Sequence, residues 1–133
     1  MLKFAVSLYA VLNATVKDCG SGKSVFTVNT MSLDPPNPAP GQRVGFTLDY
    51  TVPNNTTVTD GSALYEVTYN FIPFSPTTQT LCSNVPCPLV AGRYVNTTYS
   101  DWPTGLSGTI QTRMKWLDPV GTLLLCSEIS GKV

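Results

Sequence analysis

Arg43-Val-Gly-Phe-Thr-Leu-Asp-Tyr-Thr-Val52 is the stretch that decides the fold of this 133-residue chain. Apolar residues fall on every second position, and polar residues or glycine separate them. Because successive side chains of a β-strand point to opposite faces of a sheet, this period of two predicts a strand with one buried face. The predicted inward face carries Val44, Phe46, Leu48, Tyr50 and Val52.

The same alternation recurs twice further along the chain. In residues 64–72 the apolar face carries Tyr65, Val67, Tyr69 and Phe71, and in residues 106–116 it carries Leu106, Ile110, Met114 and Trp116. Weaker strands are predicted over 24–33, 93–100 and 121–129. Turn-forming runs of Pro, Gly, Asn and Asp separate these segments, and no amphipathic helix is indicated. The sequence therefore predicts one all-β domain, a two-sheet sandwich of six to seven strands.

The charge balance excludes several classes of function. Eight Lys and Arg residues cancel eight Asp and Glu residues, so the chain offers no basic face for nucleic acid. Histidine is absent, which removes Ser-His-Asp catalysis, Cys-His catalysis and His-ligated zinc. We therefore predict a protein that is not an enzyme, with no catalytic residues, no cofactor and no metal.

Four cysteines indicate an oxidising compartment. An even count in a short chain with glycosylation sequons favours disulfides. A zinc site is the alternative, but it would have to join the Cys82/Cys87 pair to Cys19 and Cys126, which are 107 residues apart. The spacing is typical of one bridge that ties the ends of the domain together and one local loop closure.

Two further signals fit a secreted or lumenal protein, either endolysosomal, vacuolar or extracellular. Residues 1–14 have the Lys, the apolar run and the small residues of a signal peptide, which would leave residues 15–133 as the domain. The alternative for this segment is a first β-strand. Sequons for N-linked glycans begin at Asn54, Asn55 and Asn96.

Large aromatic residues on the inward faces leave two interpretations open. They could fill a solid core, or they could line a cavity that an apolar guest occupies. The segment Tyr69-Asn-Phe-Ile-Pro-Phe-Ser-Pro76 favours a cavity mouth, because its prolines stop the pairing of a strand and splay a sheet edge.

Five short motifs, in this order, resemble the MD-2-related lipid-recognition (ML) domains. These are Val16-Lys-Asp-Cys-Gly-Ser21, Asp34-Pro-Pro-Asn-Pro-Ala-Pro-Gly41, Ile72-Pro-Phe-Ser-Pro76, Cys82-Ser-Asn-Val-Pro-Cys87-Pro88 and Leu125-Cys-Ser-Glu-Ile129. The family includes the Niemann-Pick type C2 sterol carrier and the phosphatidylglycerol/phosphatidylinositol transfer proteins. The resemblance implies an immunoglobulin-like sandwich with one lipid between its sheets, and disulfides Cys19–Cys126 and Cys82–Cys87.

The resemblance also implies a site and a function. Phe74 matches an aromatic residue at the pocket entrance, Trp102-Pro103 falls at the rim, and Trp116 matches a buried pocket residue. We therefore predict binding and transfer of a sterol or phospholipid, with transient contact to a membrane or a partner protein. The alternative is a packed protein-interaction module, such as a receptor accessory subunit or a component of a surface assembly. The predicted pocket comprises Phe46, Leu48, Tyr50, Tyr65, Val67, Tyr69, Phe71, Phe74, Trp102, Pro103, Ile110, Met114 and Trp116.

Overall fold

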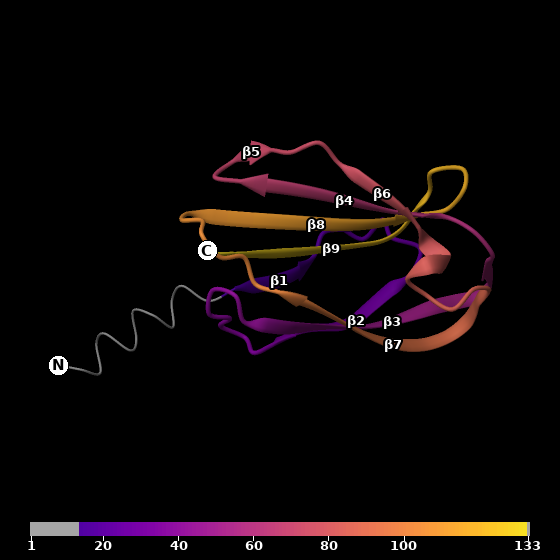
Figure 1. Cartoon of the computed structure of the whole chain (residues 1–133). Helices are drawn as coiled ribbons and strands as arrows, with labels where there is room; N and C mark the ends of the chain where they lie inside the picture. The colour runs from indigo at the N-terminus through magenta and orange to yellow at the C-terminus, as the bar shows by residue number, and fades with distance from the viewer. Residues whose placement is uncertain (1–13, 133) are drawn as a thin grey trace.

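A computed structural model describes residues 14–132, in which nine β-strands form two antiparallel sheets packed face to face (Figure 1). The predicted signal peptide lies outside the described residues except for its last position, Ala14. The strands are β1 (Thr15–Asp18), β2 (Thr27–Asp34), β3 (Arg43–Val58), β4 (Ser62–Tyr69), β5 (Ile72–Pro73), β6 (Thr77–Thr80), β7 (Leu89–Asp101), β8 (Thr109–Leu117) and β9 (Leu123–Lys132), with a 3₁₀ turn η1 (Leu81–Ser83) before β7.

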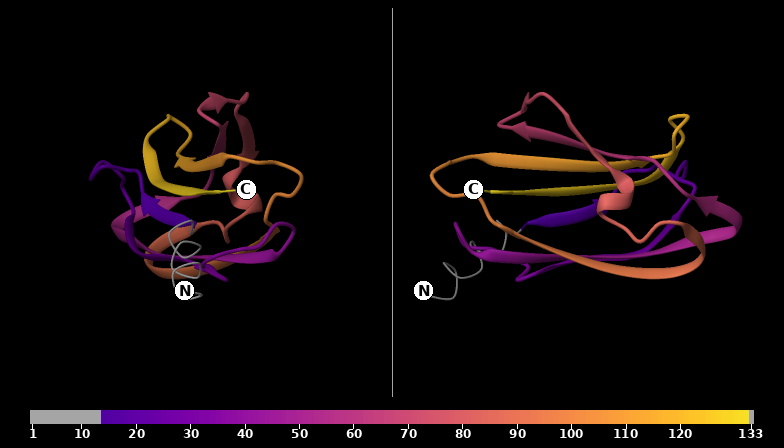
Figure 2. Two further views of the ribbon diagram at one scale, coloured as in Figure 1. Left: turned by 90° about the vertical axis from the view of Figure 1, so that its left-hand side faces the viewer. Right: turned by 45° about the vertical axis from the view of Figure 1, so that its right-hand side comes forward.

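The larger sheet has the strand order β1-β9-β8-β4, and the short strands β5 and β6 both pair with the remaining edge of β4. The smaller sheet has the order β2-β3-β7. Two views turned from that of Figure 1 show these sheets as separate layers (Figure 2). The predicted two-sheet sandwich is confirmed. It has more strands than predicted because β1, β5 and β6 are only four, two and four residues long, too short to display a clear alternation.

The central strand β3 behaves as its sequence predicts. Val44, Leu48, Tyr50 and Val52 are buried, and Phe46 is partly buried against the core. The long aliphatic and aromatic side chains on this face give β3 its stability, because each buries apolar area against the opposite sheet. Within the core, Tyr50 stacks on Phe26 at 5.8 Å between ring centroids.

Both disulfides implied by the resemblance are present. Cys19 directly follows β1 and joins Cys126 of β9, so the first strand is fixed covalently to the last. Cys82 and Cys87 close the loop that leads from η1 into β7. The chain therefore has no free cysteine among the described residues.

The edge next to β4 is interrupted, in agreement with the prolines in its sequence. The Phe74 amide still donates a hydrogen bond to the Val67 carbonyl, at 2.8 Å, before the ladder stops. Pairing resumes at Thr77 after Ser75 and Pro76. One edge of the larger sheet is thus discontinuous.

Candidate functional site: a cavity between the two sheets

A cavity of about 460 Å³ lies between the sheets. Phe46 and Leu48 of β3 form part of one wall, and Met114, Trp116 and Ile129 form part of the other. A cavity of this size and composition is typical of a site for an apolar ligand. The remaining lining residues are Tyr65, Gln79, Asn84, Asn96, Thr98, Tyr99, Ser100, Thr112 and Ser127.

The cavity exists because small residues replace the aromatic side chains along the inner faces. Trp116 and Tyr50 meet edge to face at 5.1 Å and fill the sandwich at their level. Further along the larger sheet the inward positions of β8 and β9 include the small residues Thr112 and Ser127. These short side chains do not reach the opposite sheet, so space remains between the layers.

The edge strand β7 lines the cavity with uncharged polar groups. Residues paired across an antiparallel ladder project to the same face. Asn96 pairs with Leu48, Thr98 with Phe46 and Ser100 with Val44, so all three face the interior with β3.

Between residues 95 and 100 the polarity of β7 is therefore the reverse of that expected for a sandwich strand. Its outward residues Val95 and Tyr99 are 63% and 62% exposed. In this segment its inward residues are an amide and two hydroxyls, at Asn96, Thr98 and Ser100, of which Thr98 and Ser100 remain exposed. Polar side chains in this position are favourable only where water or a ligand can satisfy their hydrogen bonds.

Two further polar residues are Gln79 of β6 and Asn84, which directly follows η1. The Asn84 amide nitrogen Nδ2 lies 3.4 Å from the Tyr65 hydroxyl and 3.4 Å from Gln79 Oε1, and donates to both. Burial raises the pKa of Tyr65, so its hydroxyl stays protonated at neutral pH. Gln79 and Asn84 thus add neutral donors and acceptors to the lining.

Trp116 is the most enclosed of the aromatic residues that line the cavity, at 1% exposure. Its ring packs against Tyr50, whose pKa burial and the neighbouring Tyr94 raise to about 12. The Trp116 indole nitrogen Nε1 is buried and finds no acceptor within residues 14–132. A buried donor without a partner is rare in proteins and calls for an explanation.

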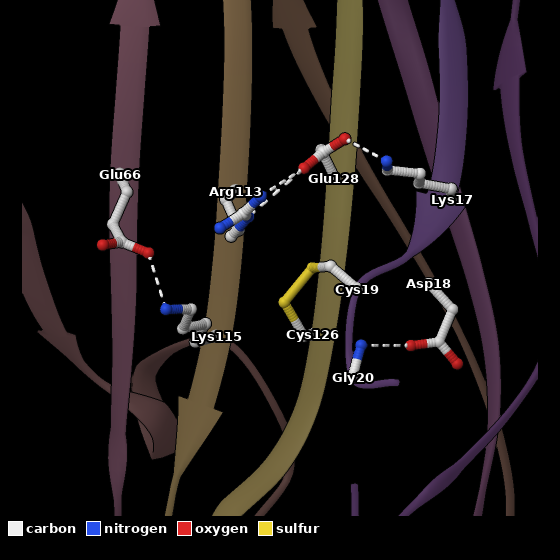
Figure 3. Close-up of polar contacts among 9 residues, drawn as sticks. All are labelled: Lys17, Asp18, Cys19, Gly20, Glu66, Arg113, Lys115, Cys126 and Glu128. Atoms are coloured by element: carbon white, nitrogen blue, oxygen red, sulfur yellow. Dashed lines mark hydrogen bonds and ion pairs between the residues drawn. A yellow bond between two sulfur atoms is a disulfide. The ribbon is translucent and has the colours of Figure 1, made fainter. Parts of the chain in front are cut away.

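Charged side chains occupy the opposite, outer face of the larger sheet (Figure 3). Arg113 Nη2 lies 2.7 Å from Glu128 Oε1, and Lys17 Nζ lies 3.1 Å from Glu128 Oε2. Burial of Glu128 raises its pKa, but hydrogen bonds and attraction from Arg113 and Lys17 together outweigh this effect and lower the pKa. Lys115 pairs with Glu66 at 2.9 Å on the same face. Because Arg113 and Lys115 alternate along β8 with the inward Thr112, Met114 and Trp116, these ions point away from the cavity.

A smaller hollow of about 270 Å³ lies on this outer face. Phe74 and Pro76 line it together with Glu66, Gln111 and Arg113. Phe74 is 55% exposed there. The structure therefore separates Phe74 from the cavity between the sheets by the thickness of the larger sheet.

The structure brings five of the predicted pocket residues together in the cavity wall: Phe46, Leu48, Tyr65, Met114 and Trp116. Tyr50 packs beside them in the core. The other predicted pocket residues are not part of the lining, and their role in ligand binding stays a prediction. They are Val67, Tyr69, Phe71, Phe74, Trp102, Pro103 and Ile110.

Three of these residues have clear positions elsewhere. The Tyr69 hydroxyl donates to the Ser107 carbonyl at 2.6 Å. Phe71 is 89% exposed in the turn between β4 and β5. Trp102 is buried, and its Nε1 donates to the Lys132 carbonyl at 3.1 Å.

The three glycosylation candidates fall in two different environments. Asn54 and Asn55 are exposed, whereas Asn96 is half-buried in the wall of the cavity. A glycan on Asn96 would have to occupy space at the cavity. Glycosylation at each position stays a prediction.

A family model of the ML domain matches residues 13–133. The chain belongs to the ML domain family. A relative in Dictyostelium discoideum is 34% identical over 80 residues, and its name assigns it provisionally to the phosphatidylglycerol/phosphatidylinositol transfer proteins. That match covers 58% of this ML domain chain and 55% of the relative, so the chain spans only about half of the relative's length.

Two solved structures share the fold of this ML domain. A Niemann-Pick type C2 protein from the Japanese carpenter ant superposes with a TM-score of 0.65 at 13% identity, over 89% of this chain and 98% of the ant protein. Chicken MD-1, solved in complex with lipid IVa, superposes with a TM-score of 0.61 at 8% identity, over 90% of this chain and 88% of MD-1. At these identities the likeness is one of fold.

Proposed function

We propose that this ML domain binds a lipid between its two sheets and carries it between membranes or partner proteins. The observation that supports this most directly is the cavity of about 460 Å³, with apolar walls and a polar edge. The names of the relatives point in the same direction, since they include a phospholipid transfer protein and a protein solved with a bound lipid.

Burial of apolar area is the driving force for such binding. Each Å² of apolar ligand surface removed from water contributes roughly 25 cal/mol, against the cost of immobilising the ligand. The apolar walls provided by Phe46, Leu48, Met114 and Ile129 would receive the hydrocarbon part. No covalent step is needed, and the absence of histidine from the sequence supports a carrier rather than an enzyme.

A secreted or lumenal location fits this function. The two disulfides would persist in an oxidising compartment. Lipid transfer between membranes through water in such a compartment requires a water-soluble carrier. A solidly packed interaction module is the alternative. The cavity argues against it, because such a core fills its interior at close packing and leaves no space of this size.

A pair of tryptophan substitutions on β8 tests the proposal. Met114→Trp fills the cavity, whereas Gln111→Trp places the same side chain on the outer face, in the smaller hollow. Binding of a fluorescent fatty acid or sterol to delipidated protein should be lost in the first variant and retained in the second. Circular dichroism and thermal unfolding check that both variants fold.

Two results would contradict the proposal. The first is delipidated wild-type protein that binds no lipid probe at micromolar concentration, together with native mass spectrometry of the purified protein that detects no lipid. The second is loss of binding in Gln111→Trp with full binding in Met114→Trp, which would move the site to the outer face.

A further inference from the structure

We infer that the cavity is selective for an uncharged lipid that carries hydroxyl or ester oxygens, such as a monoacylglycerol or a sterol, and rejects anionic phospholipids. This inference rests on the proposed function, because it names the class of lipid for the same cavity. It comes from the side chains that line the cavity and from the position of the charges around it.

None of the 14 residues that line the cavity carries a charge. The charged residues of β3, β7, β8 and β9 point by register to the outer faces of the two sheets, and several of them form ion pairs. Arg93 bonds to Asp49 on the outer face of the smaller sheet, and Arg113 bonds to Glu128 on the outer face of the larger sheet. Arg43 lies over the Tyr99 ring, 4.8 Å from its centroid; by register both residues point outward, although Tyr99 also borders the cavity.

A phosphate group would therefore enter the cavity without a cation to meet it. Neutral amide and hydroxyl donors bind a phosphate more weakly than a cation does, so they offset only part of the cost of removing the anion from water. A neutral hydroxyl or ester group carries no such penalty once it is hydrogen-bonded. The lining thus discriminates against charge rather than against polarity.

The reversed polarity of β7 supplies the hydrogen bonds. Asn96, Thr98 and Ser100 project inward at alternate positions, about 7 Å apart, and together span roughly 13 Å of the wall. Amide and hydroxyl side chains both donate and accept, so they match ligand hydroxyls and ester carbonyls equally well. A ladder of this length can contact polar groups at several points along a ligand.

Trp116 adds an independent observation. Its indole nitrogen is a donor only, and it has no acceptor among the residues described. Trp116 lines the cavity, so an oxygen of the ligand would complete its hydrogen bond. A ligand that places a carbonyl or hydroxyl oxygen at this depth explains an otherwise unfavourable buried donor.

The volume favours a single chain or one compact ring system. At about 30 Å³ for each water-sized group, a cavity of 460 Å³ holds roughly 15 such groups. That number accommodates most of one acyl chain, or much of one sterol skeleton. Two acyl chains of a phospholipid together have about twice as many carbons.

The test compares two ligands that differ only in a phosphate. Monooleoylglycerol and oleoyl lysophosphatidic acid share one acyl chain and one glycerol. Titration of each into delipidated wild-type protein, below its micellar concentration, should show monooleoylglycerol binding at least roughly tenfold more tightly. Equal or tighter binding of lysophosphatidic acid would overturn the inference. Failure of both ligands and of cholesterol to bind would instead contradict the proposed function.

A matched pair of variants tests the cause of the selectivity. Thr98→Lys places a cation at the cavity, and Thr97→Lys places it on the outward face of the same strand. Both proteins should be produced without glycans, because the first variant also removes the sequon at Asn96. Thr98→Lys should raise the affinity for lysophosphatidic acid by roughly tenfold, and Thr97→Lys should not. No change in Thr98→Lys, or the same gain in both variants, would show that the missing cation does not set the selectivity.

Discussion

Replacement of Cys19 and Cys126 by alanine should destabilise the domain far more than replacement of Cys82 and Cys87. A disulfide restricts the unfolded chain in proportion to the logarithm of the loop that it closes. The first bridge joins residues 107 positions apart, and the second joins residues 5 positions apart. The chain-entropy relation then gives a loss of about 4.8 kcal/mol for the first pair and about 2 kcal/mol for the second.

Urea unfolding of the wild type and the two double variants, followed by tryptophan fluorescence, measures these losses directly. The terminal pair should also lower the melting temperature by roughly 15–25 °C, at about 3–5 °C per kcal/mol for a domain of this size. A total stability on the order of 10 kcal/mol makes both variants measurable. If the two variants lost the same stability to within about 1 kcal/mol, or if the order were reversed, the entropic reasoning would be refuted.

The same experiment connects stability to the cavity. Cys126 is followed on β9 by Ser127 and, two residues later, by Ile129, both of which line the cavity. Cys19 holds β1 against this strand. The variant without the terminal bridge should therefore release a bound fluorescent lipid faster than the variant without the Cys82–Cys87 bridge, and equal release rates would show that β1 does not support the cavity wall.

Three further results are expected. Asp49→Asn should lower the melting temperature at pH 6, and the difference from the wild type should shrink as the pH falls below about 4. Hydrogen bonds from Arg93 lower the pKa of Asp49 to about 2, so the ionised carboxylate stabilises the fold until it is protonated. A difference in melting temperature that stays constant from pH 6 to pH 2 would contradict this. Gly131→Ala should lower the free energy of unfolding in urea by roughly 1–3 kcal/mol, because an added Cβ would lie 2.7 Å from the Trp102 ring. Unchanged stability would show that the ring moves freely. Expression in a secretory host should place glycans at the exposed Asn54/Asn55 sequons rather than at Asn96, which peptide mass spectrometry can check.

Local alternation predicted the architecture because it reports directly on burial. The apolar positions of residues 43–52 face the opposite sheet, as their spacing requires. Met114 and Trp116 were placed correctly on an inward face by the same reasoning, and both line the cavity. Strand pairing then depends on register, which a period of two constrains but does not specify.

The polar wall was missed because β7 contradicts the rule that apolar residues face inward. Between residues 95 and 100 the more apolar of its two faces, with Val95 and Tyr99, points to solvent. Only pairing with β3 shows that Asn96 and Thr98 face the cavity. The reversed alternation was present in the sequence, but without the partner strand it did not indicate which face was buried.

The position of Phe74 could not be predicted for a different reason. Its segment combines an interrupted strand with prolines, and the side-chain direction depends on where pairing with β4 stops. The backbone remains hydrogen-bonded through Phe74 and breaks only after it. The ring nevertheless lines the outer hollow with Glu66 and Arg113, a placement that residue types alone do not encode.

The reversed strand and the paired ions have one physical explanation in common. A sandwich that must admit a polar part of its ligand needs hydrogen-bonding groups inside, yet any unpaired charge there would be costly while the cavity is empty. Neutral amides and hydroxyls at Asn96, Thr98 and Ser100 satisfy both demands, because water can hydrogen-bond to them before the ligand arrives. The charged side chains lie on the outer face instead, where Glu128 stays ionised between Arg113 and Lys17. The separation of charge from polarity is therefore what allows one small domain to be stable when empty and selective when occupied.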